Sequence, residues 1–387
     1  MNLEKRIKRH IIGRRQAFLA VTLPGVETIC RKELNALSQT IEVTDTFRGG
    51  VAFNGRLEDL YRANLHLHTA GRILMRVAAF KVTNFNQLAK HLTDIQWALY
   101  LPPGSVPLCK VTARHSRLYH SRAVADQATS AIGVYWTSLG VPNHRVDDQT
   151  LHLRLDQDML VLSLDSSGTN LYQRGLKTHG TKAPLRETTA AAILRMAGYH
   201  PDRPLLDPMC GAGTFSLEAA LMAKSQAPGL HRSFAFMQWP AFRPPQWHFL
   251  TDRALQQIRQ LQHPSIQASD VNARGCERLA ACVQRTGLQD AVKVTCRDFF
   301  NLSSEACIGS PGLIVLNPPY GRRLNPDQTP ARFYSRIGEK LKQTFPGWRV
   351  ALIVPDLRLA ETIPFKLEHF KLQHGGLRLT LLMGTIR

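Results

Sequence analysis

The chain has 387 residues and a formal net charge of +20, from 49 Lys and Arg against 29 Asp and Glu. This length predicts two or three domains with cores of their own. The excess of positive charge favours a polyanionic partner, and nucleic acid is the commonest one. No run approaches the roughly 20 apolar residues of a membrane span, and the basic N-terminus lacks the apolar core of a signal peptide, so we expect a cytoplasmic protein.

The seven cysteines are scattered through the chain and never occur as CxxC. This distribution argues against a zinc ribbon, an iron–sulfur site and a disulfide framework, and it predicts reduced thiols and no metal site. Cys210 lies beside a glycine turn, but no His or Asp next to it in sequence suggests a nucleophile. We interpret it as a small packing residue.

The first part of the chain mixes strand and helix patterns. Residues 18–37 predict a strand, a Pro-Gly turn and an amphipathic helix, and residues 41–55 predict two strands joined around Gly49 and Gly50. A helical segment (57–71) and a further strand (74–82) follow. The pattern is typical of a small α+β layer.

Residues 85–164 continue this mixture, and they end in an alternating segment that predicts a β-hairpin. Basic and aromatic side chains interleave just after a predicted strand here, as they do in RNA contacts. A solvated loop explains the same composition equally well. The residues concerned are Lys110, Arg114, His115, Arg117, Tyr119, His120 and Arg122.

The segment LLDPMCGAGTF (205–215) predicts a buried strand, a turn with Gly211 and Gly213, and the start of a helix. Free N–H groups at such a helix N-terminus commonly face a bound nucleotide. A dinucleotide fingerprint would require a third glycine where this chain has Ser216, so nicotinamide and flavin cofactors fit poorly. Taken alone, the turn is as well explained by a purely structural role.

The segment LIVLNPPYG (313–321) strengthens the case for a binding site. Its four apolar residues predict a strand buried on both faces that ends at Asn317. Pro318 and Pro319 rigidify the backbone, so the Asn317 amide and the Pro318 carbonyl can serve as fixed acceptors. Tyr320 adds an aromatic face. Two acceptors and a stacking ring are what methylation of a planar amine requires.

At this point the sequence resembles the class I S-adenosylmethionine-dependent methyltransferases with an NPPY motif. More narrowly, it is similar to the THUMP-containing RlmL group, which methylates guanine N2 in 23S ribosomal RNA. The matching segments include PGVETICRKEL, LYQRG, APLRETTAAAIL, DPMCGAGTFSLEAALMA, APGL with FAFMQWPAF, NPPYGRRL and LKQTFPGW. They extend from residue 24 to residue 348, and thus over nearly the whole chain.

The resemblance implies a role for each motif. It assigns Asn317, Pro318, Pro319 and Tyr320 to catalysis, and Arg322 and Arg323 to RNA phosphate. It implies that Asp270 binds the ribose hydroxyls, that Asp298 accepts from the adenine amine and that Phe299 lies against its ring. Asp270 follows Asp207 by 63 residues (270 − 207), far more than the usual spacing of about 20, because of an insertion that the family shares. The other cofactor-binding candidates are Arg186, Glu187, Thr188, Asp207, Pro208, Cys210, Gly211, Gly213 and Thr214, with Asn317 also contacting the cofactor.

We therefore expect an α/β protein with four segments. These are an N-terminal ferredoxin-like α+β region (1–75), a THUMP RNA-binding domain (76–165), a linker (166–186) and a Rossmann-like methyltransferase domain with a mostly parallel sheet (187–387). The expected function is guanine-N2 methylation of 23S ribosomal RNA with S-adenosylmethionine, with RNA contacts at Lys110, Arg114, Arg117 and Arg122. Three alternatives remain: methylation of guanine N2 in tRNA or of adenine N6, a non-catalytic RNA-binding or ribosome-assembly factor, and a DNA methyltransferase.

Overall fold

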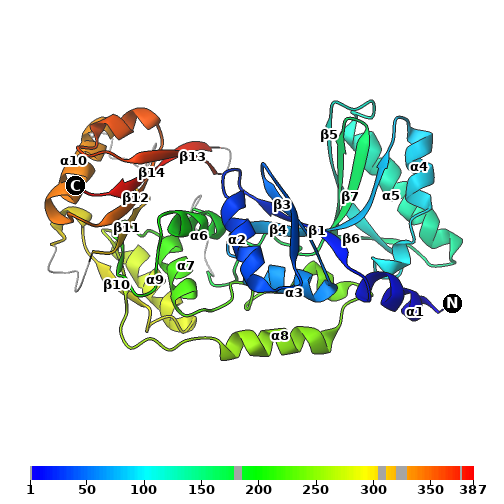
Figure 1. Ribbon diagram of the computed structural model, residues 1–387, viewed down its shortest axis with the longest axis horizontal. Coiled ribbons are helices and arrows are strands. Elements are labelled where there is room, and N and C mark those ends of the chain that lie inside the picture. Colours follow the sequence, from blue (N-terminus) through cyan, green and yellow to red (C-terminus); the bar gives the residue numbers. More distant parts are fainter. Residues whose placement is uncertain (1, 178–184, 304–310, 320–328, 375–376) are drawn as a thin grey trace. The chain divides into compact units, whose positions relative to one another are not determined.

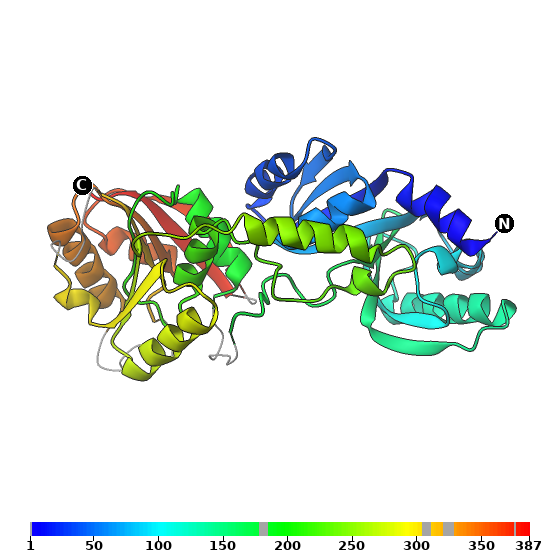
Figure 2. The same ribbon diagram turned by 90° about the horizontal axis from the view of Figure 1, so that it is seen from below.

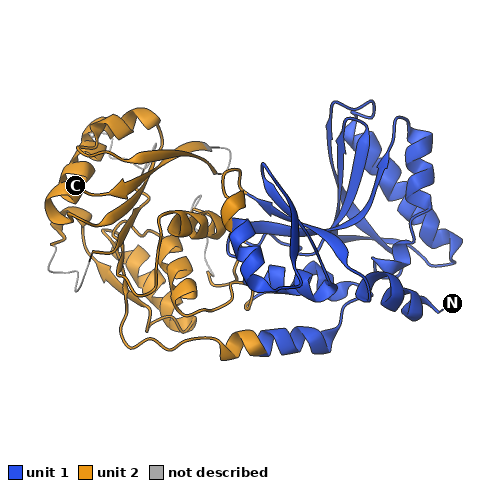
Figure 3. Ribbon diagram, viewed as in Figure 1, with its two compact units in different colours: residues 1–22, 30–171, 232–252 blue, residues 23–29, 172–231, 253–387 orange. Residues whose placement is uncertain are grey.

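The computed structural model describes residues 2–177, 185–303, 311–319, 329–374 and 377–387 (Figure 1). The chain forms two compact units, and each is discontinuous in sequence (Figure 3). The first contains residues 1–22, 30–171 and 232–252, and the second contains residues 23–29, 172–231 and 253–387. Each unit is built on a seven-stranded sheet.

The sheet of the first unit has the strand order β2-β3-β1-β4-β7-β6-β5. Its strands are β1 (Gln16–Thr22), β2 (Glu42–Phe47), β3 (Gly50–Gly55), β4 (Ala70–Lys81), β5 (Ser105–Arg114), β6 (His144–Asp156) and β7 (Met159–Asp165). The helices of this part of the chain are α1 (Leu3–Ile7), α2 (Glu27–Leu37), α3 (Leu57–His66), α4 (Phe85–Thr93) and α5 (Ser121–Ser138). All neighbouring strands are antiparallel except β5 and β6, which are parallel.

Strand β4 is shared by two regions that the sequence separates. It pairs with β1 on one side and with β7 on the other. The expected boundary between residues 75 and 76 therefore falls inside a strand, and the two expected N-terminal regions contribute to one continuous sheet. The four expected segment limits stay a prediction.

The insertion after α7 (Thr214–Ala223) contributes residues 232–252 to the first unit. Its aromatic side chains surround Tyr61 of α3. The Tyr61 ring stacks on Phe236 at 4.6 Å between centroids, and Phe242 and Trp247 meet it edge-on. The Tyr61 hydroxyl accepts a hydrogen bond from the Arg243 backbone N–H at 3.2 Å. Burial of large rings contributes strongly to packing, which explains why this Trp- and Phe-rich stretch joins the first unit.

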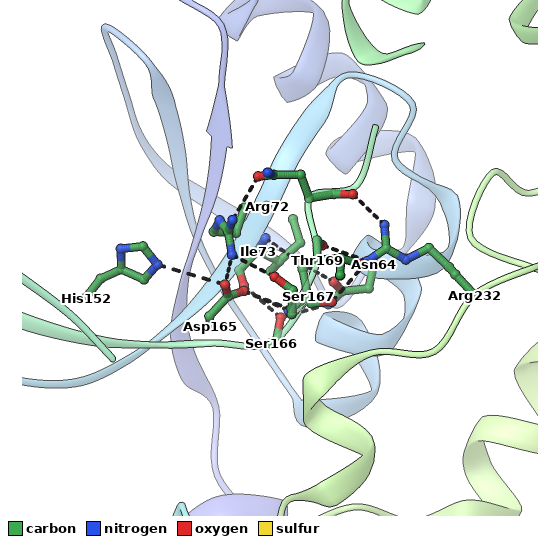
Figure 4. Close-up of polar contacts among 11 residues, drawn as sticks. Asn64, Arg72, Ile73, His152, Asp165, Ser166, Ser167, Thr169 and Arg232 are labelled. Carbon is green, nitrogen blue, oxygen red and sulfur yellow. Dashed lines mark hydrogen bonds and ion pairs between the residues drawn. The ribbon is translucent and has the colours of Figure 1, made fainter. Parts of the chain in front are cut away.

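A second contact of the insertion is polar (Figure 4). The Arg232 guanidinium donates to the backbone carbonyls of Ser167, Thr169 and Asn170 at 2.7–3.1 Å. The turn after β7 that carries these carbonyls is also held by buried Asp165, which accepts from the Ser167 N–H at 2.9 Å and pairs with Arg72. The Nη1 and Nη2 groups of this arginine thus satisfy backbone carbonyls that would otherwise be costly to bury.

The sheet of the second unit has the order β10-β9-β8-β11-β12-β14-β13. Its strands are β8 (Leu205–Asp207), β9 (Ile266–Asp270), β10 (Val292–Cys296), β11 (Leu313–Leu316), β12 (Arg349–Val354), β13 (Glu368–His374) and β14 (Leu377–Thr385). The remaining helices are α6 (Glu187–Met196), α8 (Pro244–Gln256), α9 (Ala273–Arg285) and α10 (Pro330–Thr344). Neighbouring strands are parallel from β10 through β9, β8 and β11 to β12, and β14 is antiparallel to both of its neighbours, β12 and β13. This confirms the expected mostly parallel sheet.

Helices cover both faces of this sheet (Figure 2). Apolar side chains of α6, α7 and α9 pack in one core with Leu205, Ala268 and Val315. Side chains of α10 pack in a second core with Leu206 and Ile314. Successive residues of one strand thus enter opposite cores, which is why the central strands are apolar at every position. In the part of the chain that the structure describes, no helix is long and apolar enough to cross a membrane.

Candidate functional site

The carboxyl ends of the parallel strands carry the predicted site residues. Strand β8 lies between β9 and β11, with Asp207 opposite Ala268 and Leu206 opposite Ile314. Asp270 ends β9, and Asn317 directly follows β11. Both residues therefore lie at the sheet edge where the glycine turn leaves β8. Ligands of open α/β sheets bind at this edge.

The glycine turn contacts the carboxylate of β9 directly. The Gly211 N–H donates to Asp270 Oδ2 at 2.9 Å, and the Asn272 N–H donates to Asp270 Oδ1 at 3.0 Å. The first bond joins residues 59 positions apart, and together the two bonds fix the carboxylate beside the turn. The structure thus brings these two predicted cofactor-binding residues together, and their contact with a cofactor stays a prediction.

The two glycines of the turn serve different purposes. Both have positive φ, 52° at Gly211 and 70° at Gly213, where L side chains are disfavoured. A methyl group added at Gly213 would lie 2.2 Å from Leu279 Cδ1 of α9, so packing demands this glycine. A methyl group at Gly211 would meet nothing within 4 Å. Gly211 therefore leaves open space over bare backbone, where a ligand can approach.

Asp207 and Cys210 lie beneath the turn and are buried. Asp207 Oδ2 accepts from the Ser216 hydroxyl at 2.6 Å and from the Ser216 N–H at 3.2 Å. Burial raises the pKa of Asp207 to about 7 although both donors oppose the shift. Burial also raises the pKa of the Cys210 thiol, which agrees with a packing role and not with a nucleophile.

Removing the Ser216 hydroxyl should destabilise the protein more at pH 8.5 than at pH 5. Because the folded pKa of Asp207 is about 7 and its usual value is 3.8, the folded state holds a proton that the unfolded state releases between these values. This group therefore lowers the free energy of unfolding as pH rises from about 4 to about 7, and its effect levels off above. Ser216→Ala raises the folded pKa further, so we expect a loss of about 1–3 kcal/mol at pH 8.5 and less at pH 5.

Thermal unfolding of both proteins at pH 5 and pH 8.5, followed by circular dichroism, measures this difference. Ser335→Ala is the matched control, because its hydroxyl contacts the exposed Glu339 side chain on α10. An equal loss at both pH values would contradict a charge-dependent role for the Ser216 hydroxyl.

Lys177 is a site residue that sequence reasoning missed. Its ammonium donates to Thr214 Oγ1 at 2.8 Å and lies 2.9 Å from Glu187 Oε1. Thr214 begins α7 after the glycine turn, and Glu187 begins α6. One lysine thus ties together two predicted cofactor segments. In the sequence, Lys177 lies three residues after Arg174, which belongs to the LYQRG segment of the resemblance, and this proximity could have marked it as a site residue.

Lys177→Met should weaken cofactor binding about 3- to 10-fold while leaving the fold intact. Methionine keeps the length of the side chain but cannot bridge Glu187 and Thr214, and partly buried ion pairs of this kind contribute about 1 kcal/mol. Titration calorimetry with S-adenosylhomocysteine measures the change. The control is Lys342→Met on α10, where the lysine contacts only the Pro364 carbonyl among the described residues. Equal affinities of the two variants would show that the bridge does not support the site.

The other predicted residues of this region lie close by in the chain. Arg186 is exposed before α6, with its guanidinium 5.1 Å from the Tyr172 ring centroid. Thr188 is buried in the first turn of α6, and Pro208 is buried directly after β8. Their contacts with a cofactor stay a prediction.

Asp298 and Phe299 follow β10 and differ in accessibility. Asp298 is half-buried, and its Oδ1 accepts from the Phe300 N–H at 2.9 Å. Phe299 is 1% exposed and belongs to the core that α10 covers. Phe300 is the half-buried ring of the pair. The structure thus places Phe299 in the core, and its expected contact with adenine stays a prediction.

Asn317 presents an unused acceptor at the end of β11. Its Oδ1 is buried and has no hydrogen-bond partner among the described residues. A buried amide oxygen without a partner is costly, and such atoms commonly mark a ligand position. Pro318 is buried and Pro319 is exposed. Tyr320, Arg322 and Arg323 lie outside the described residues.

Four of the predicted RNA-binding residues belong to the first unit, namely Lys110, Arg114, Arg117 and Arg122. Lys110 and Arg114 are exposed on β5, and Arg122 is exposed at the start of α5. Arg117 is exposed but contacts Asp158, through its N–H at 2.8 Å and its Nε at 3.6 Å. In the described part of the chain, no group of three or more His, Cys, Asp or Glu could hold a metal ion.

Comparison with protein families gives two matches. Residues 174–381 match the RMKL-like methyltransferase domain, and residues 17–74 match the RlmL ferredoxin-like domain. The second match covers most of the expected N-terminal region. The THUMP assignment of residues 76–165 stays a prediction.

Curated relatives match along nearly the whole chain. The putative RNA methyltransferase slr0064 of Synechocystis is 33% identical, over 95% of this chain and 97% of that protein. The ribosomal RNA large subunit methyltransferase K/L of Syntrophotalea carbinolica is also 33% identical, over 94% of this chain but 53% of its own length. The chain therefore spans about half of the K/L protein.

Solved structures have the same fold. The putative methyltransferase SMU.472, complexed with S-adenosylhomocysteine, has a TM-score of 0.86 at 26% identity and covers 97% of this chain and 99% of its own. A predicted N6-adenine-specific DNA methylase from Listeria monocytogenes has a TM-score of 0.86 at 27% identity and covers 96% of both chains. These matches confirm the expected class I methyltransferase fold and the resemblance to the RlmL group. With a family match over more than half of its residues and relatives of one-third identity along most of its length, the chain belongs to the RMKL-like family of S-adenosylmethionine-dependent methyltransferases.

Proposed function

We propose that the protein methylates the exocyclic N2 amine of a guanine in 23S ribosomal RNA. The observation that carries the proposal is the buried Oδ1 of Asn317, which has no partner in the described residues and lies at the strand edge beside the glycine turn. The names of the K/L relatives point to ribosomal RNA of the large subunit. Such a substrate would place the protein in the cytoplasm, as the sequence predicted.

The residues around the turn suit S-adenosylmethionine. The Asp270 carboxylate can accept from ribose hydroxyls, because each oxygen retains a lone pair beyond its backbone hydrogen bond. The open space at Gly211 admits the ligand to the backbone. When bound, S-adenosylmethionine supplies a methyl group on a positively charged sulfur, which is a strong electrophile with a neutral leaving group.

Asn317 would orient the substrate amine. Its Oδ1 accepts one N–H of the amine, and the Pro318 carbonyl is the second acceptor that the sequence predicts. Accepting both protons turns the nitrogen lone pair out of the ring plane toward the methyl group, and holding it there lowers the entropic part of the barrier. No strong base is required before transfer, because the amine releases its proton as it gains the methyl group. A guanine in a folded RNA must first be flipped out of its stack.

A second candidate is methylation of adenine N6. The same pair of acceptors orients any planar exocyclic amine, and the similar Listeria protein carries the name of an N6-adenine-specific DNA methylase. Guanine N7 is disfavoured, because this ring nitrogen carries no N–H for Asn317 Oδ1 to accept.

The test incubates the purified protein with isotopically labelled S-adenosylmethionine and one of four substrates: large-subunit ribosomal RNA, small-subunit ribosomal RNA, tRNA or duplex DNA. Nucleoside mass spectrometry then identifies the product. N2-methylguanosine in large-subunit RNA alone is the expected result. N2-methylguanosine in tRNA or N6-methyladenosine would replace the proposed substrate with the corresponding alternative, and N7-methylguanosine would contradict the role of Asn317. No product on any substrate, with no heat of cofactor binding, would favour a non-catalytic RNA-binding factor.

A further inference from the structure

Residues 172–177 run along α7 within the second unit, and we call this segment the strap. The Arg174 guanidinium donates to Glu218 of α7, and the Lys177 ammonium donates to Thr214 Oγ1 at 2.8 Å. Thr214 and Glu218 are four residues apart in a helix, so their side chains lie on one face. Because the later strap residue contacts the earlier helix residue, the strap runs toward the N-terminus of α7, where the glycine turn joins the helix.

The contact between Arg174 and Glu218 is a buried ion pair with two parallel hydrogen bonds. Arg174 Nε donates to Glu218 Oε1 at 3.0 Å, and Arg174 Nη2 donates to Glu218 Oε2 at 3.2 Å. The arginine side chain is 3% exposed and the glutamate side chain is 0% exposed. A planar guanidinium that binds both oxygens of a carboxylate permits one relative orientation of the two groups. The pair therefore fixes the position of the strap along α7.

Stability alone does not explain a charged pair at this place in the core. Taking two charges out of water opposes folding, and apolar side chains of similar size often stabilise a core equally well. The residues of α7 on either side of Glu218 are apolar, and both Leu217 and Ala219 belong to the main core of this unit. What the ion pair adds to apolar packing is a defined register between the strap and the helix.

The next two residues of the strap carry this register toward the cofactor site. Gly175 has a φ of 79°, and a methyl group added there would lie 2.3 Å from the His231 carbonyl oxygen. The Leu176 side chain is buried, and its carbonyl accepts from Arg285 Nη2 at 2.5 Å. Lys177 follows directly, so residues 174–176 set its place beside the start of α7.

We propose that Arg174 is a positioning residue for the cofactor and that it acts through Lys177. Its pair with Glu218 sets the register of the strap, and this register holds the Lys177 ammonium between Thr214 at the start of α7 and Glu187 at the start of α6. The inference rests on the cofactor site that the proposed function uses, but it does not depend on which RNA is methylated.

The decisive variant replaces both members of the pair, as Arg174→Met with Glu218→Met. Methionines fill the same space and leave no unpaired charge, so the melting temperature should stay within about 5 °C of wild type. Calorimetry should nevertheless find S-adenosylhomocysteine bound about 3- to 10-fold more weakly, which is the loss expected for Lys177→Met. In methylation assays the KM for the cofactor should rise by the same factor, and kcat should change less than about twofold.

Combining these substitutions with Lys177→Met tests whether Arg174 acts through the lysine. If it does, the triple variant should bind S-adenosylhomocysteine no more than about twofold more weakly than Lys177→Met alone, because one interaction is lost in both cases. Independent effects would multiply to a loss of about 10- to 100-fold. That result would overturn the inference.

The matched control is Lys224→Met with Asp290→Asn. It removes another largely buried ion pair of the same unit, at the opposite end of α7, and asparagine keeps an acceptor for the Leu261 N–H. Its cofactor affinity should stay within about twofold of wild type.

A conservative variant covers the case in which the double variant does not fold. Arg174→Lys retains the charge but lacks the two-nitrogen fork, so it should bind S-adenosylhomocysteine about 2- to 5-fold more weakly. Wild-type affinity in either Arg174 variant would overturn the inference and leave the proposed function intact. A wild-type protein that binds the cofactor but methylates no RNA would overturn the proposed function and leave this inference intact.

Discussion

Replacing Asn317 with alanine is expected to lower the rate of methyl transfer about 100- to 1,000-fold at saturating cofactor and RNA, the usual effect of losing one preorganised polar group at a reacting centre. We expect this loss because the buried Asn317 Oδ1 has no hydrogen-bond partner in the described residues and is therefore available to bind the substrate amine. Without it the amine is free to rotate, and its lone pair is no longer held toward the methyl group. Single-turnover assays with labelled cofactor measure the rate.

The controls for Asn317 separate orientation from folding and from cofactor binding. Asn317→Asp keeps an acceptor at the same place and should retain more activity than Asn317→Ala. Asn301→Ala removes an exposed amide outside the site and should be neutral. For Asn317→Ala, calorimetry should find the affinity for S-adenosylhomocysteine within about threefold of wild type, which is a loss of about 0.7 kcal/mol or less of binding free energy. Unchanged turnover in Asn317→Ala would remove this residue from the mechanism.

Replacing Asp270 with alanine should give the reverse pattern, in which cofactor binding suffers first. The carboxylate is held by the N–H groups of Gly211 and Asn272, so its two oxygens are preorganised for the ribose hydroxyls. A hydrogen bond to a charged group contributes about 1.5–3 kcal/mol, which corresponds to a roughly 10- to 100-fold weaker binding of S-adenosylhomocysteine. The rate at saturating cofactor should fall much less.

Two further variants support this assignment. Asp270→Asn retains the shape of the side chain and one acceptor, so its affinity should lie between those of the wild type and Asp270→Ala. Asp202→Ala removes an exposed carboxylate that contacts His200 and should have no effect on binding. If Asp270→Ala bound the cofactor as tightly as wild type and lost only turnover, the ribose assignment would be wrong.

Local sequence patterns were sufficient to predict the central strands of the second unit and the residues at their carboxyl ends. Strand β11 has four apolar residues followed by Asn317 and two prolines, and strand β8 is followed by two glycines. Parallel strands buried on both faces leave this signature, because each residue enters one of two cores and the chain must turn sharply at the edge. The edge position of Asp207, Asp270 and Asn317 follows directly from it.

Other features depend on residues far apart in the chain. The register of β4 between β1 and β7 merges two expected regions into one sheet. The insertion 232–252 joins the first unit through Tyr61, whose ring contacts residues more than 170 positions later. Lys177 meets Glu187 and Thr214 only once two helices begin side by side. The Tyr61–Phe236 and Lys177–Thr214 pairs lie too far apart in sequence for any local pattern to predict them.

The sequence by itself predicted the candidate site of this protein, because a glycine turn, an acidic strand end and an Asn-Pro-Pro segment are local patterns of residue type. Only the tertiary structure decided which segments neighbour one another, and therefore that Arg174 meets Glu218 and Lys177 meets Thr214. The packing of distant segments is set by the burial of apolar surface between them, so charged residues that look scattered in the sequence become paired once the core has formed.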